Sequence, residues 1–422
     1  MGGSTATAGV VVIGGGQAGI QVADSLRTAG YDHPVTIVAD EDVLPYQRPP
    51  LSKDYLGAGR SPEPLPLRAA GFFADRRLVL RRGVAARRID RVSRNVTLAD
   101  GSRLAYDRLV LATGASNRAL TCPGAELPGV RALRTLDDAR SLRRELEQVD
   151  DVVVVGGGFI GLEFAAAARQ RGVRVTVLEF GNRPMGRALS PTAGDWFADA
   201  HRRDGVDLRL GEGIASIVAG DDGRAAAAVS TTGRHYRADL VVVGIGVVPN
   251  TELALDARLE VDNGIVVDET LTTSDSAILA VGDCANFPSS RSGGRLRLES
   301  VQNATDQGRH AARTIVEGPG RYDDVPWFWS TQGALRLQIA GVSAPGDVTT
   351  VVGDRGVGRF SVICHRNGHL SAVESVNSPA DHLAARKLLA AGGGPSPEEV
   401  AVPGFSLKAF ARHTPTRTVA TH

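Results

Sequence analysis

Two glycine clusters have the spacing that a bound dinucleotide pyrophosphate requires. They occupy residues 14–19 and 156–161, each in the order GxGxxG. In this pattern the glycines allow a tight turn, a close approach of the backbone to the phosphates and close packing of a helix on a strand. The helix that follows offers its unpaired backbone amides to the phosphate oxygens. We expect two dinucleotide-binding turns, formed by Gly14, Gly16, Ala18 and Gly19 in the first copy and by Gly156, Gly158, Ile160 and Gly161 in the second.

An acidic residue about 20 positions after such glycines typically accepts hydrogen bonds from a ribose. Glu179 has this place in the second copy, where its charge would favour the free ribose hydroxyls of NADH and repel the extra phosphate of NADPH. Arg183 and Arg187 could receive a phosphate or could be solvated surface residues. In the first copy Ala39 aligns with Glu179, so we expect the acceptor to be the next residue, Asp40.

Buried parallel strands that run into helices would position both turns. Continuous apolar runs at 10–13 and 152–155 precede the glycines, and further strands are expected at 35–38 and 173–178. These segments make two strand-turn-helix-strand units whose glycines begin at residues 14 and 156. Because solenoid repeats are shorter, a repeat of this length indicates duplicated nucleotide-binding units.

The remaining segments supply further strands and a helix for the two nucleotide-binding units and indicate a third domain. Residues 106–114 and 238–246 both run from a buried strand into glycine, and residues 301–316 have a helical pattern. Beyond residue 320, alternating strands are expected at 335–340, 360–364 and 370–376. The sequence predicts an α/β fold with two Rossmann-like dinucleotide-binding domains and a smaller C-terminal α+β domain. The expected boundaries are 1–114 with 246–323 for the first domain, 115–245 for the second, 324–410 for the third and 411–422 for a tail.

Composition excludes several classes of protein. The 422 residues carry 48 Lys and Arg against 47 Asp and Glu, and 42% are hydrophobic, which is typical of a globular protein and not of a nucleic-acid-coating or disordered one. No apolar run is long enough for a membrane span, and we expect neither a secretory signal nor an anchor. The three cysteines, Cys122, Cys284 and Cys364, are too widely spaced for a disulfide framework or a metal cluster, so we expect them to be structural, no metal to be bound and the location to be cytoplasmic.

Several motifs together resemble a known family. The most specific is PYQRPPLSK at residues 45–53, because the glycine motifs are shared by many flavoproteins. The combination, which spans residues 8–410, is similar to the FAD-dependent NADH:ferredoxin reductases of the putidaredoxin-reductase and ring-hydroxylating-dioxygenase type, within the glutathione-reductase fold. Its other members are GGGQAG, ATG at 112–114, GGGFIGLE, VGDCA at 281–285, LESVQNA at 298–304 and PWFW at 326–329.

This resemblance implies that the first domain binds FAD and the second binds NADH. It places Lys53 beside the flavin N5 edge, paired with Glu163, with Arg48 close by and Trp329 covering the flavin ring. A fixed cation stabilises the negative charge of a reduced flavin, and a carboxylate keeps a poorly solvated ammonium charged. From the residues alone, Glu163 could equally be a first-turn glutamate favoured by the helix dipole, and Trp329 a core tryptophan.

Further residues are assigned to the cofactors by the same resemblance. Asp283 would bind the ribityl or pyrophosphate region of FAD, and the backbone of Val301, at a helix N-terminus, would face the flavin N1/O2 side. Many relatives have WSDQ followed by a bulky residue, whereas residues 329–333 here are WSTQG, which puts the electron exit path in doubt. The remaining expected cofactor contacts are Ala112, Thr113, Gly114 and Gly246.

An absence separates this chain from other enzymes of the same fold. Disulfide reductases carry a CxxxxC pair just after the first unit, and residues 40–60 contain no cysteine. Electrons from a reduced flavin must then go to an external acceptor. We expect hydride transfer from NADH to FAD and single-electron transfer to a 2Fe-2S ferredoxin that supplies a monooxygenase or dioxygenase. The alternatives are a rubredoxin-type or nitrite-reductase-type NADH reductase and an NADH-sensing flavoprotein resembling apoptosis-inducing factor.

Overall fold

The computed structural model describes residues 8–57, 63 and 65–413, which form two compact units. Unit 1 contains the described residues up to Gln47, those from Leu65 to Ser116, and Val248–Asp324. Unit 2 contains the remaining described residues, including Arg48, Asn117–Val247 and those from Val325 onward. The segment that begins at Arg48 lies inside the sequence range predicted for the first domain, but it packs with unit 2. The short strands β8 (Ala115–Asn117) and β17 (Val247–Pro249) occur where the chain passes from one unit to the other.

Unit 1 is organised around a five-stranded parallel sheet in the order β19-β7-β1-β2-β3. Its central strand, VVVI, is buried along its whole length because parallel strands covered on both faces need apolar side chains on both faces. Val10 pairs with Val35 on one side and with Arg108 on the other. The strands are β1 (Val10–Ile13), β2 (Val35–Val38), β3 (Val79–Arg81), β7 (Arg108–Leu111) and β19 (Ile278–Ala280).

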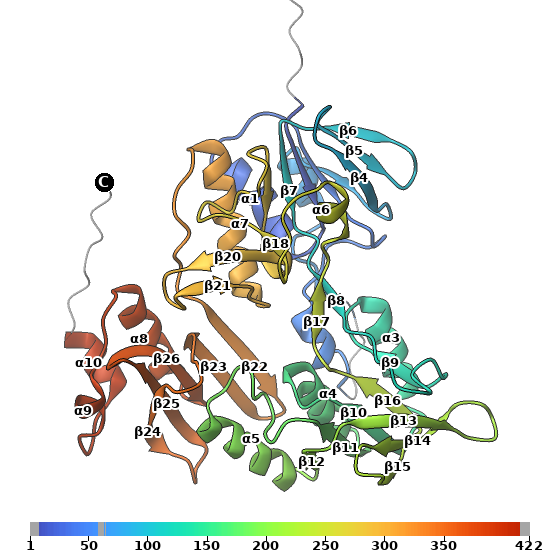
Figure 1. The fold of residues 1–422 in the computed structure, drawn as a ribbon, viewed down its shortest axis with the longest axis vertical. Coiled ribbons are helices and arrows are strands. Elements are labelled where there is room, and N and C mark those ends of the chain that lie inside the picture. The colour runs from blue at the N-terminus through green and yellow to red at the C-terminus, as the bar shows by residue number, and fades with distance from the viewer. Residues whose placement is uncertain (1–7, 58–62, 64, 414–422) are drawn as a thin grey trace, which may run out of the picture. The chain divides into compact units, whose positions relative to one another are not determined.

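Two helices of unit 1, α1 (Gln17–Thr28) and α7 (Val301–Val316), pack side by side (Figure 1). Their close approach requires glycine, since a Cβ on Gly308 would lie 2.9 Å from the backbone oxygen of Ala18. Gln17 also donates a hydrogen bond to Thr305 Oγ1 at 3.0 Å. Ser300 begins α7 by accepting a hydrogen bond from the amide of Asn303, as predicted for a helix at 301–316.

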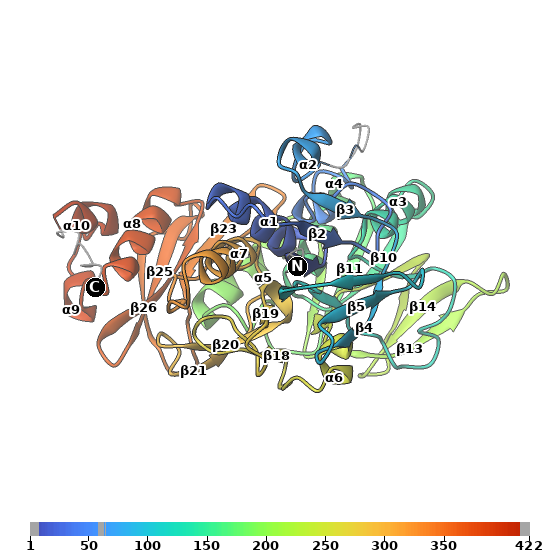
Figure 2. The ribbon, with the colours of Figure 1, turned by 90° about the horizontal axis from the view of Figure 1, so that it is seen from above.

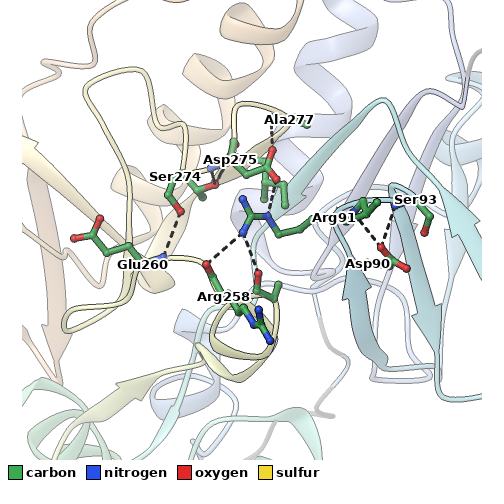
Figure 3. A network of polar contacts seen from close by, with 12 residues as sticks. Asp90, Arg91, Ser93, Arg258, Glu260, Ser274, Asp275 and Ala277 are labelled. Carbon is green, nitrogen blue, oxygen red and sulfur yellow. Dashed lines mark hydrogen bonds and ion pairs between the residues drawn. The ribbon is translucent and has the colours of Figure 1, made fainter.

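A three-stranded antiparallel sheet is inserted before the fourth strand of unit 1, and Arg91 ties it to a neighbouring segment (Figure 3). Arg91 donates to the Asp275 carboxylate at 2.7 Å and to the carbonyls of Ala257 and Arg258 at 3.3 Å. Asp90 accepts the backbone amides that close the adjacent turn. The other elements of unit 1 are β4 (Ala86–Asp90), β5 (Asn95–Leu98), β6 (Arg103–Ala105), β18 (Ile265–Val266), β20 (Ala285–Ser289), β21 (Gly294–Leu296), α2 (Gly71–Asp75), α6 (Glu252–Asp256) and the 3-10 turn η2 (Gly282–Cys284).

The first part of unit 2 repeats this architecture. Its parallel sheet has the order β12-β11-β10-β16-β9, and a three-stranded antiparallel sheet again precedes the strand, β16, that pairs with β10 as β7 pairs with β1. The duplication predicted from the glycine clusters therefore extends to the inserted sheets. The elements are β9 (Val130–Ala132), β10 (Asp151–Val155), β11 (Arg174–Glu179), β12 (Asp207–Leu210), β13 (Ile214–Ala219), β14 (Ala225–Ser230), β15 (His235–Arg237), β16 (Leu240–Val243), α3 (Leu136–Glu145), α4 (Phe159–Gln170), α5 (Pro191–Arg203) and the 3-10 turn η1 (Pro49–Ser52).

The second part of unit 2 is a five-stranded antiparallel sheet in the order β22-β23-β26-β25-β24, with helix α8 packed on β23 and β26 (Figure 2). Three of these strands lie where the alternating pattern predicts them, so the predicted fold class is confirmed. Helix α10 continues to His413, and the rest of the predicted tail, 414–422, lies outside the described residues. The elements are β22 (Trp327–Gln332), β23 (Leu335–Gly341), β24 (Val348–Asp354), β25 (Arg359–Arg366), β26 (His369–Val376), α8 (Pro379–Ala390), α9 (Pro397–Val400) and α10 (Leu407–His413).

Across the described residues, every helix is too short or too polar to cross a membrane. Within the same residues, His, Cys, Asp and Glu side chains form no group of three that could hold a metal ion. All three cysteines are free thiols, and burial raises the pKa of Cys122, Cys284 and Cys364. These thiols are therefore poor nucleophiles.

Candidate active site and dinucleotide-binding turns

The first glycine turn leaves open space at the start of α1. Gly14 has φ +121°, and a Cβ there would lie 2.0 Å from the carbonyl oxygen of Ala112. A Cβ on Gly19 would lie 2.0 Å from the oxygen of Gly14, whereas a Cβ on Gly16 would meet no atom within 4 Å. The fold itself thus requires the first and third glycines. The second borders an open space in front of the helix amides, which a pyrophosphate fits.

The second glycine turn repeats this geometry in unit 2. A Cβ on Gly156, where φ is +105°, would lie 2.5 Å from the oxygen of Gly244, and a Cβ on Gly161 would lie 2.1 Å from the oxygen of Gly156. Around Gly158 the nearest atom would be 3.8 Å away. Ile160, in the first turn of α4, is 45% exposed. The second turn can therefore accept a second dinucleotide in the same way.

The acidic residues that follow these turns differ between the two copies. Glu179 ends β11, and its two carboxylate oxygens accept hydrogen bonds of 2.7 Å from the amides of Gly157 and Gly181. In unit 1, Ala39 takes the equivalent place, since a Cβ on Gly15 would lie 2.7 Å from its Cβ. Asp40 is exposed at the carboxyl end of β2. Glu179 is thus held rigidly at the sheet edge, while the role of Asp40 stays a prediction.

Two arginines lie beyond Glu179 at the carboxyl edge of the unit 2 sheet. Gly246 has φ +96°, and a Cβ there would lie 3.0 Å from the guanidinium of Arg187. Arg183 is half-buried, and its Nε has no hydrogen-bond partner among the described residues. Whether either cation receives a phosphate stays a prediction.

Several predicted cofactor contacts gather around the first turn in unit 1. Asp283 lies in η2, directly after strand β19, and the amide of Gly282 donates to Gln307 Oε1 of α7 at 2.7 Å. Gln307 Nε2 is buried without a partner in the described residues, which leaves a donor available on this side of α7. Val301 is the first residue of α7.

The predicted segment Ala112–Gly114 forms a turn that Asn250 closes in unit 1. Thr113 Oγ1 donates to the carbonyl of Asn250 at 2.7 Å, and Asn250 Nδ2 donates back to the carbonyl of Thr113 at 2.9 Å. The amide of Asn250 also donates to Gly114, which has φ +69°. The turn is therefore fixed by paired backbone and side-chain groups at the carboxyl end of β7.

A buried ion pair joins Lys53 to Glu163 in unit 2. Lys53 follows η1, and its Nζ lies 2.9 Å from Glu163 Oε2 on helix α4. The Glu163 side chain is 2% exposed, and the Lys53 side chain is 18% exposed. Ser52 Oγ donates to the same carboxylate oxygen at 2.5 Å, and Ser330 Oγ donates to Oε1 at 2.6 Å. The predicted pairing of Lys53 with Glu163 is present in the structure, and every partner is a hydrogen-bond donor.

Arg48 and Trp329 lie close in sequence to the residues that contact Glu163, Arg48 before η1 and Trp329 before Ser330. Arg48 precedes η1 and donates to the carbonyl of Arg134 at 2.7 Å. Trp329 is half-buried on β22, with its ring centroid 5.5 Å from that of Trp327. Both residues belong to unit 2 with Lys53, and their proposed contacts with flavin stay predictions.

Sequence reasoning missed the two serines that bind Glu163. Ser52 lies inside the PPLSK motif next to Lys53, and Ser330 lies inside WSTQ next to Trp329. Only the structure distinguishes the second, because Ser330 and Gln332 on β22 are buried while Thr331 between them is less so. The position at which this chain departs from WSDQ therefore lies between the two buried polar residues.

Comparison with known proteins gives matches over almost the whole chain. Residues 8–308 match the family model described as pyridine nucleotide-disulphide oxidoreductase, and residues 327–411 match the model described as reductase C-terminal. Rhodocoxin reductase from Rhodococcus erythropolis is 50% identical over 408 residues, which cover 96% of this chain and 95% of that relative.

Two solved structures are also similar over almost the whole chain. A ferredoxin reductase from Rhodopseudomonas palustris has a TM-score of 0.93 and 44% identity, covering 96% of this chain and 100% of that chain. The covalent putidaredoxin reductase–putidaredoxin complex has a TM-score of 0.91 and 37% identity, covering 96% and 99%. With both glycine turns shaped for dinucleotides, the chain belongs to the pyridine nucleotide-disulphide oxidoreductase family and, within it, to the ferredoxin reductases.

Proposed function

We propose that this protein is an FAD-dependent reductase that takes electrons from NADH and passes them singly to a 2Fe-2S ferredoxin, which in turn supplies a monooxygenase or dioxygenase. The relatives named above are reductases of small electron-carrier proteins, and one similar structure contains such a carrier bound to its reductase. Bound FAD would supply the step that this exchange needs, since a flavin accepts a hydride and releases electrons one at a time.

The residues of this chain would bind the two cofactors in separate glycine turns. In unit 1, the open side of Gly16 and the amides of α1 would hold the FAD pyrophosphate, with Asp283 and Val301 nearby on η2 and α7. In unit 2, the open side of Gly158 would hold the NADH pyrophosphate. On this basis we propose residues 1–114 with 246–323 as the FAD-binding domain and 115–245 as the NADH-binding domain.

The observation that carries the proposal is the buried Lys53–Glu163 pair in a chain without a redox-active dithiol. An ammonium held at 2.9 Å from a carboxylate is a fixed positive charge, and such a charge stabilises negative charge that develops on a reduced ring. Residues 40–60 contain no cysteine that could receive the electrons. The electrons would therefore leave to another protein.

The carboxylate of Glu179 supports NADH as the preferred donor. Because the amides of Gly157 and Gly181 fix both of its oxygens, the negative charge cannot turn away from an approaching 2′-phosphate. The same oxygens retain lone pairs that can accept the free ribose hydroxyls of NADH. Since NADH and ferredoxins are soluble cytoplasmic carriers, we place the activity in the cytoplasm.

A comparison of electron acceptors tests this proposal. The FAD-loaded protein is mixed anaerobically with NADH and then with a 2Fe-2S ferredoxin, a rubredoxin or no acceptor, and the absorbance of each acceptor is followed. We expect fast reduction of the ferredoxin and slower reduction of the rubredoxin. Preferential reduction of rubredoxin, or reduction of the flavin without transfer to either protein, would contradict the proposed function.

A further inference from the structure

The polar contacts of Glu163 continue into the interior of unit 2. Ser330, which donates to Glu163, accepts a hydrogen bond of 3.2 Å from Gln332 Nε2 on the same strand. Gln332 Oε1 lies 2.6 Å from His201 Nε2 on helix α5. Ser330, Gln332 and His201 are each 1% exposed. A chain of buried side chains thus links helix α5 through strand β22 to the carboxylate that binds Lys53.

The direction of every hydrogen bond in this chain follows from chemistry. An ionised Glu163 can only accept, so the single hydroxyl proton of Ser330 is donated to it. Ser330 must then accept from Gln332, which places the amide nitrogen of Gln332 toward Ser330 and its oxygen toward His201. His201 consequently carries a proton on Nε2. The three donors therefore point toward Glu163 in one consistent order, and aligned hydrogen bonds of this kind polarise one another.

His201 has the protonation state that this order needs. Burial lowers the pKa of His201, and the opposing influences of Gln332 and Asp204 are smaller. At neutral pH the ring is therefore neutral and has one N–H, which donates to Gln332. Among the described residues, the Nε2 proton meets the Gln332 oxygen and no acidic side chain, so His201 is the outer end of this series of hydrogen bonds and not an ion-pair partner.

Helix α5 is fixed against the C-terminal sheet, so His201 is held in place. At the start of the helix, the amide and hydroxyl of Ser190 donate to the two oxygens of the buried Glu374 carboxylate at 2.7 and 2.6 Å. Farther along, Trp196 Nε1 donates to the carbonyl of Arg355 at 2.9 Å and its ring packs on Phe360. Side chains supported in this way act as preorganised partners.

We propose that Ser330, Gln332 and His201 are positioning residues for the Lys53 ammonium. By holding Glu163 Oε1, they leave Oε2 to Lys53 and Ser52 and so fix where the positive charge lies. This inference rests on the proposed function, in which that charge stabilises the reduced flavin, and it goes beyond the Lys53–Glu163 pair itself.

Removal of Ser330, Gln332 or His201 should affect the position of the Lys53 ammonium to different degrees. Without the Ser330 hydroxyl, one oxygen of a buried carboxylate would lose its donor, and the carboxylate would turn to share both oxygens with Lys53. Without Gln332 or His201, Ser330 would still donate to Glu163 but would be less polarised. The effect on Lys53 should therefore decrease in the order Ser330, Gln332, His201.

The first test detects the hydrogen bonds that join Ser330, Gln332 and His201, and it needs no enzyme turnover. The oxidised, FAD-loaded enzyme is labelled with 15N-histidine, and the His201 Nε2 resonance is assigned by its loss in His201→Phe. We expect Ser330→Ala to shift this resonance although no hydrogen bond joins Ser330 to His201, because the amide of Gln332 loses its oxygen acceptor and keeps only the weaker sulfur acceptor of Met185 at 3.3 Å. Ser361→Ala is the matched control, since Ser361 is a buried, hydrogen-bonded serine of the same sheet outside the chain. An unchanged His201 resonance in Ser330→Ala would overturn the proposal.

The second test measures the consequence for the flavin. Stopped-flow reduction by NADH should be roughly tenfold slower in Ser330→Ala, with a lower flavin midpoint potential, smaller effects in Gln332→Leu and His201→Phe, and recovery in Ser330→Thr. Wild-type rate and potential in all three variants that remove a member, with FAD still bound, would overturn the proposal. If Ser330→Ala loses FAD, the Gln332→Leu and His201→Phe variants decide. If wild-type enzyme is not reduced by NADH, the proposed function fails, while the resonance of His201 still decides whether the chain exists.

Discussion

Lys53 and Glu163 form a buried ion pair in which Nζ lies 2.9 Å from Oε2, although the two residues come from distant parts of the chain. Lys53 follows a 3-10 turn that contains two prolines, and Glu163 lies in the first turns of helix α4, which starts within the second glycine motif. The pair therefore links the most specific sequence motif of the family to the second dinucleotide turn.

Replacement of Lys53 tests the role of its charge. We predict that Lys53→Met retains FAD but is reduced by NADH at least about tenfold more slowly, because the developing negative charge loses its cation. The rate is measured by anaerobic stopped-flow absorbance. Lys408→Met is a suitable control, since Lys408 is exposed on α10. Hydride transfer at the wild-type rate in Lys53→Met would eliminate the proposed role.

Substitutions at Gly16 and Gly158 should weaken the binding of different dinucleotides. Gly16→Ala should leave the protein folded, because its Cβ meets no protein atom within 4 Å, but FAD affinity should fall by about tenfold or more as the methyl group fills the space for the phosphates. Gly158→Ala should retain FAD and instead raise the Kd for a nonreactive NADH analogue. Both constants are measured by fluorescence titration.

Two controls make this test specific. Gly71→Ala, where a Cβ would meet only a side-chain oxygen at 3.8 Å, should leave both affinities unchanged. Gly14→Ala should fail to fold normally, because its Cβ would lie 2.0 Å from a backbone oxygen. Unaltered FAD binding in a folded Gly16→Ala variant would show that the pyrophosphate lies elsewhere.

Glu179 is predicted to determine the choice between NADH and NADPH. Its fixed carboxylate should repel a 2′-phosphate, so Glu179→Ala should reduce the ratio of kcat/KM for NADH over NADPH by about tenfold or more. Asp199→Ala removes an exposed acidic residue of α5 and should leave that ratio unchanged. A preference for NADH that survives in Glu179→Ala would assign the discrimination to other residues.

A buried histidine predicts loss of stability at low pH. Burial, with a smaller effect of Arg386, lowers the pKa of His382 from 6.5 to about 4. The folded state therefore favours the neutral ring, and its contribution is complete above pH 6.5 and decreases as the pH falls toward 4. Between pH 6.5 and pH 5 the loss should reach about 2 kcal/mol.

Thermal unfolding at pH 7.5 and pH 5 checks this expectation. The fall in Tm on acidification should be smaller in His382→Phe than in the wild type, because the variant has no proton to bind at this position. Exposed His369 provides a control, and His369→Asn should behave like the wild type. An equal acid-induced fall in Tm in His382→Phe would indicate that other groups cause it.

The sequence predicted the parts of the fold that local patterns determine. Both glycine turns and their flanking strands follow from residue spacing, and the helix at residues 301–316 follows from its helical pattern. The strands β22 and β24 and the inserted sheet β13–β15 were not predicted, because segments such as WFWSTQ, VTTVVGD and AAAAVS do not alternate apolar with polar residues. These strands form because they pair with neighbouring strands in the folded protein.

The candidate site was predictable only in part. Lys53 was paired with Glu163 by family resemblance, since no local pattern brings η1 and α4 together. Ser330, Gln332 and His201 were not predicted, because serine, glutamine and histidine within a strand or helix are common on surfaces and become informative only when their burial is known. The hydrogen bonds of Glu179 to two glycine amides likewise depend on the exact turn geometry.

Electron counting with a single pair of proteins tests the central claim most directly. A known amount of NADH is added anaerobically to a catalytic amount of the FAD-loaded enzyme with excess oxidised 2Fe-2S ferredoxin, and the reduced ferredoxin is quantified by its absorbance. The account predicts two ferredoxins reduced for each NADH consumed, because a hydride carries two electrons and each cluster accepts one. NADH consumption without ferredoxin reduction, or a protein that binds no flavin, would contradict it.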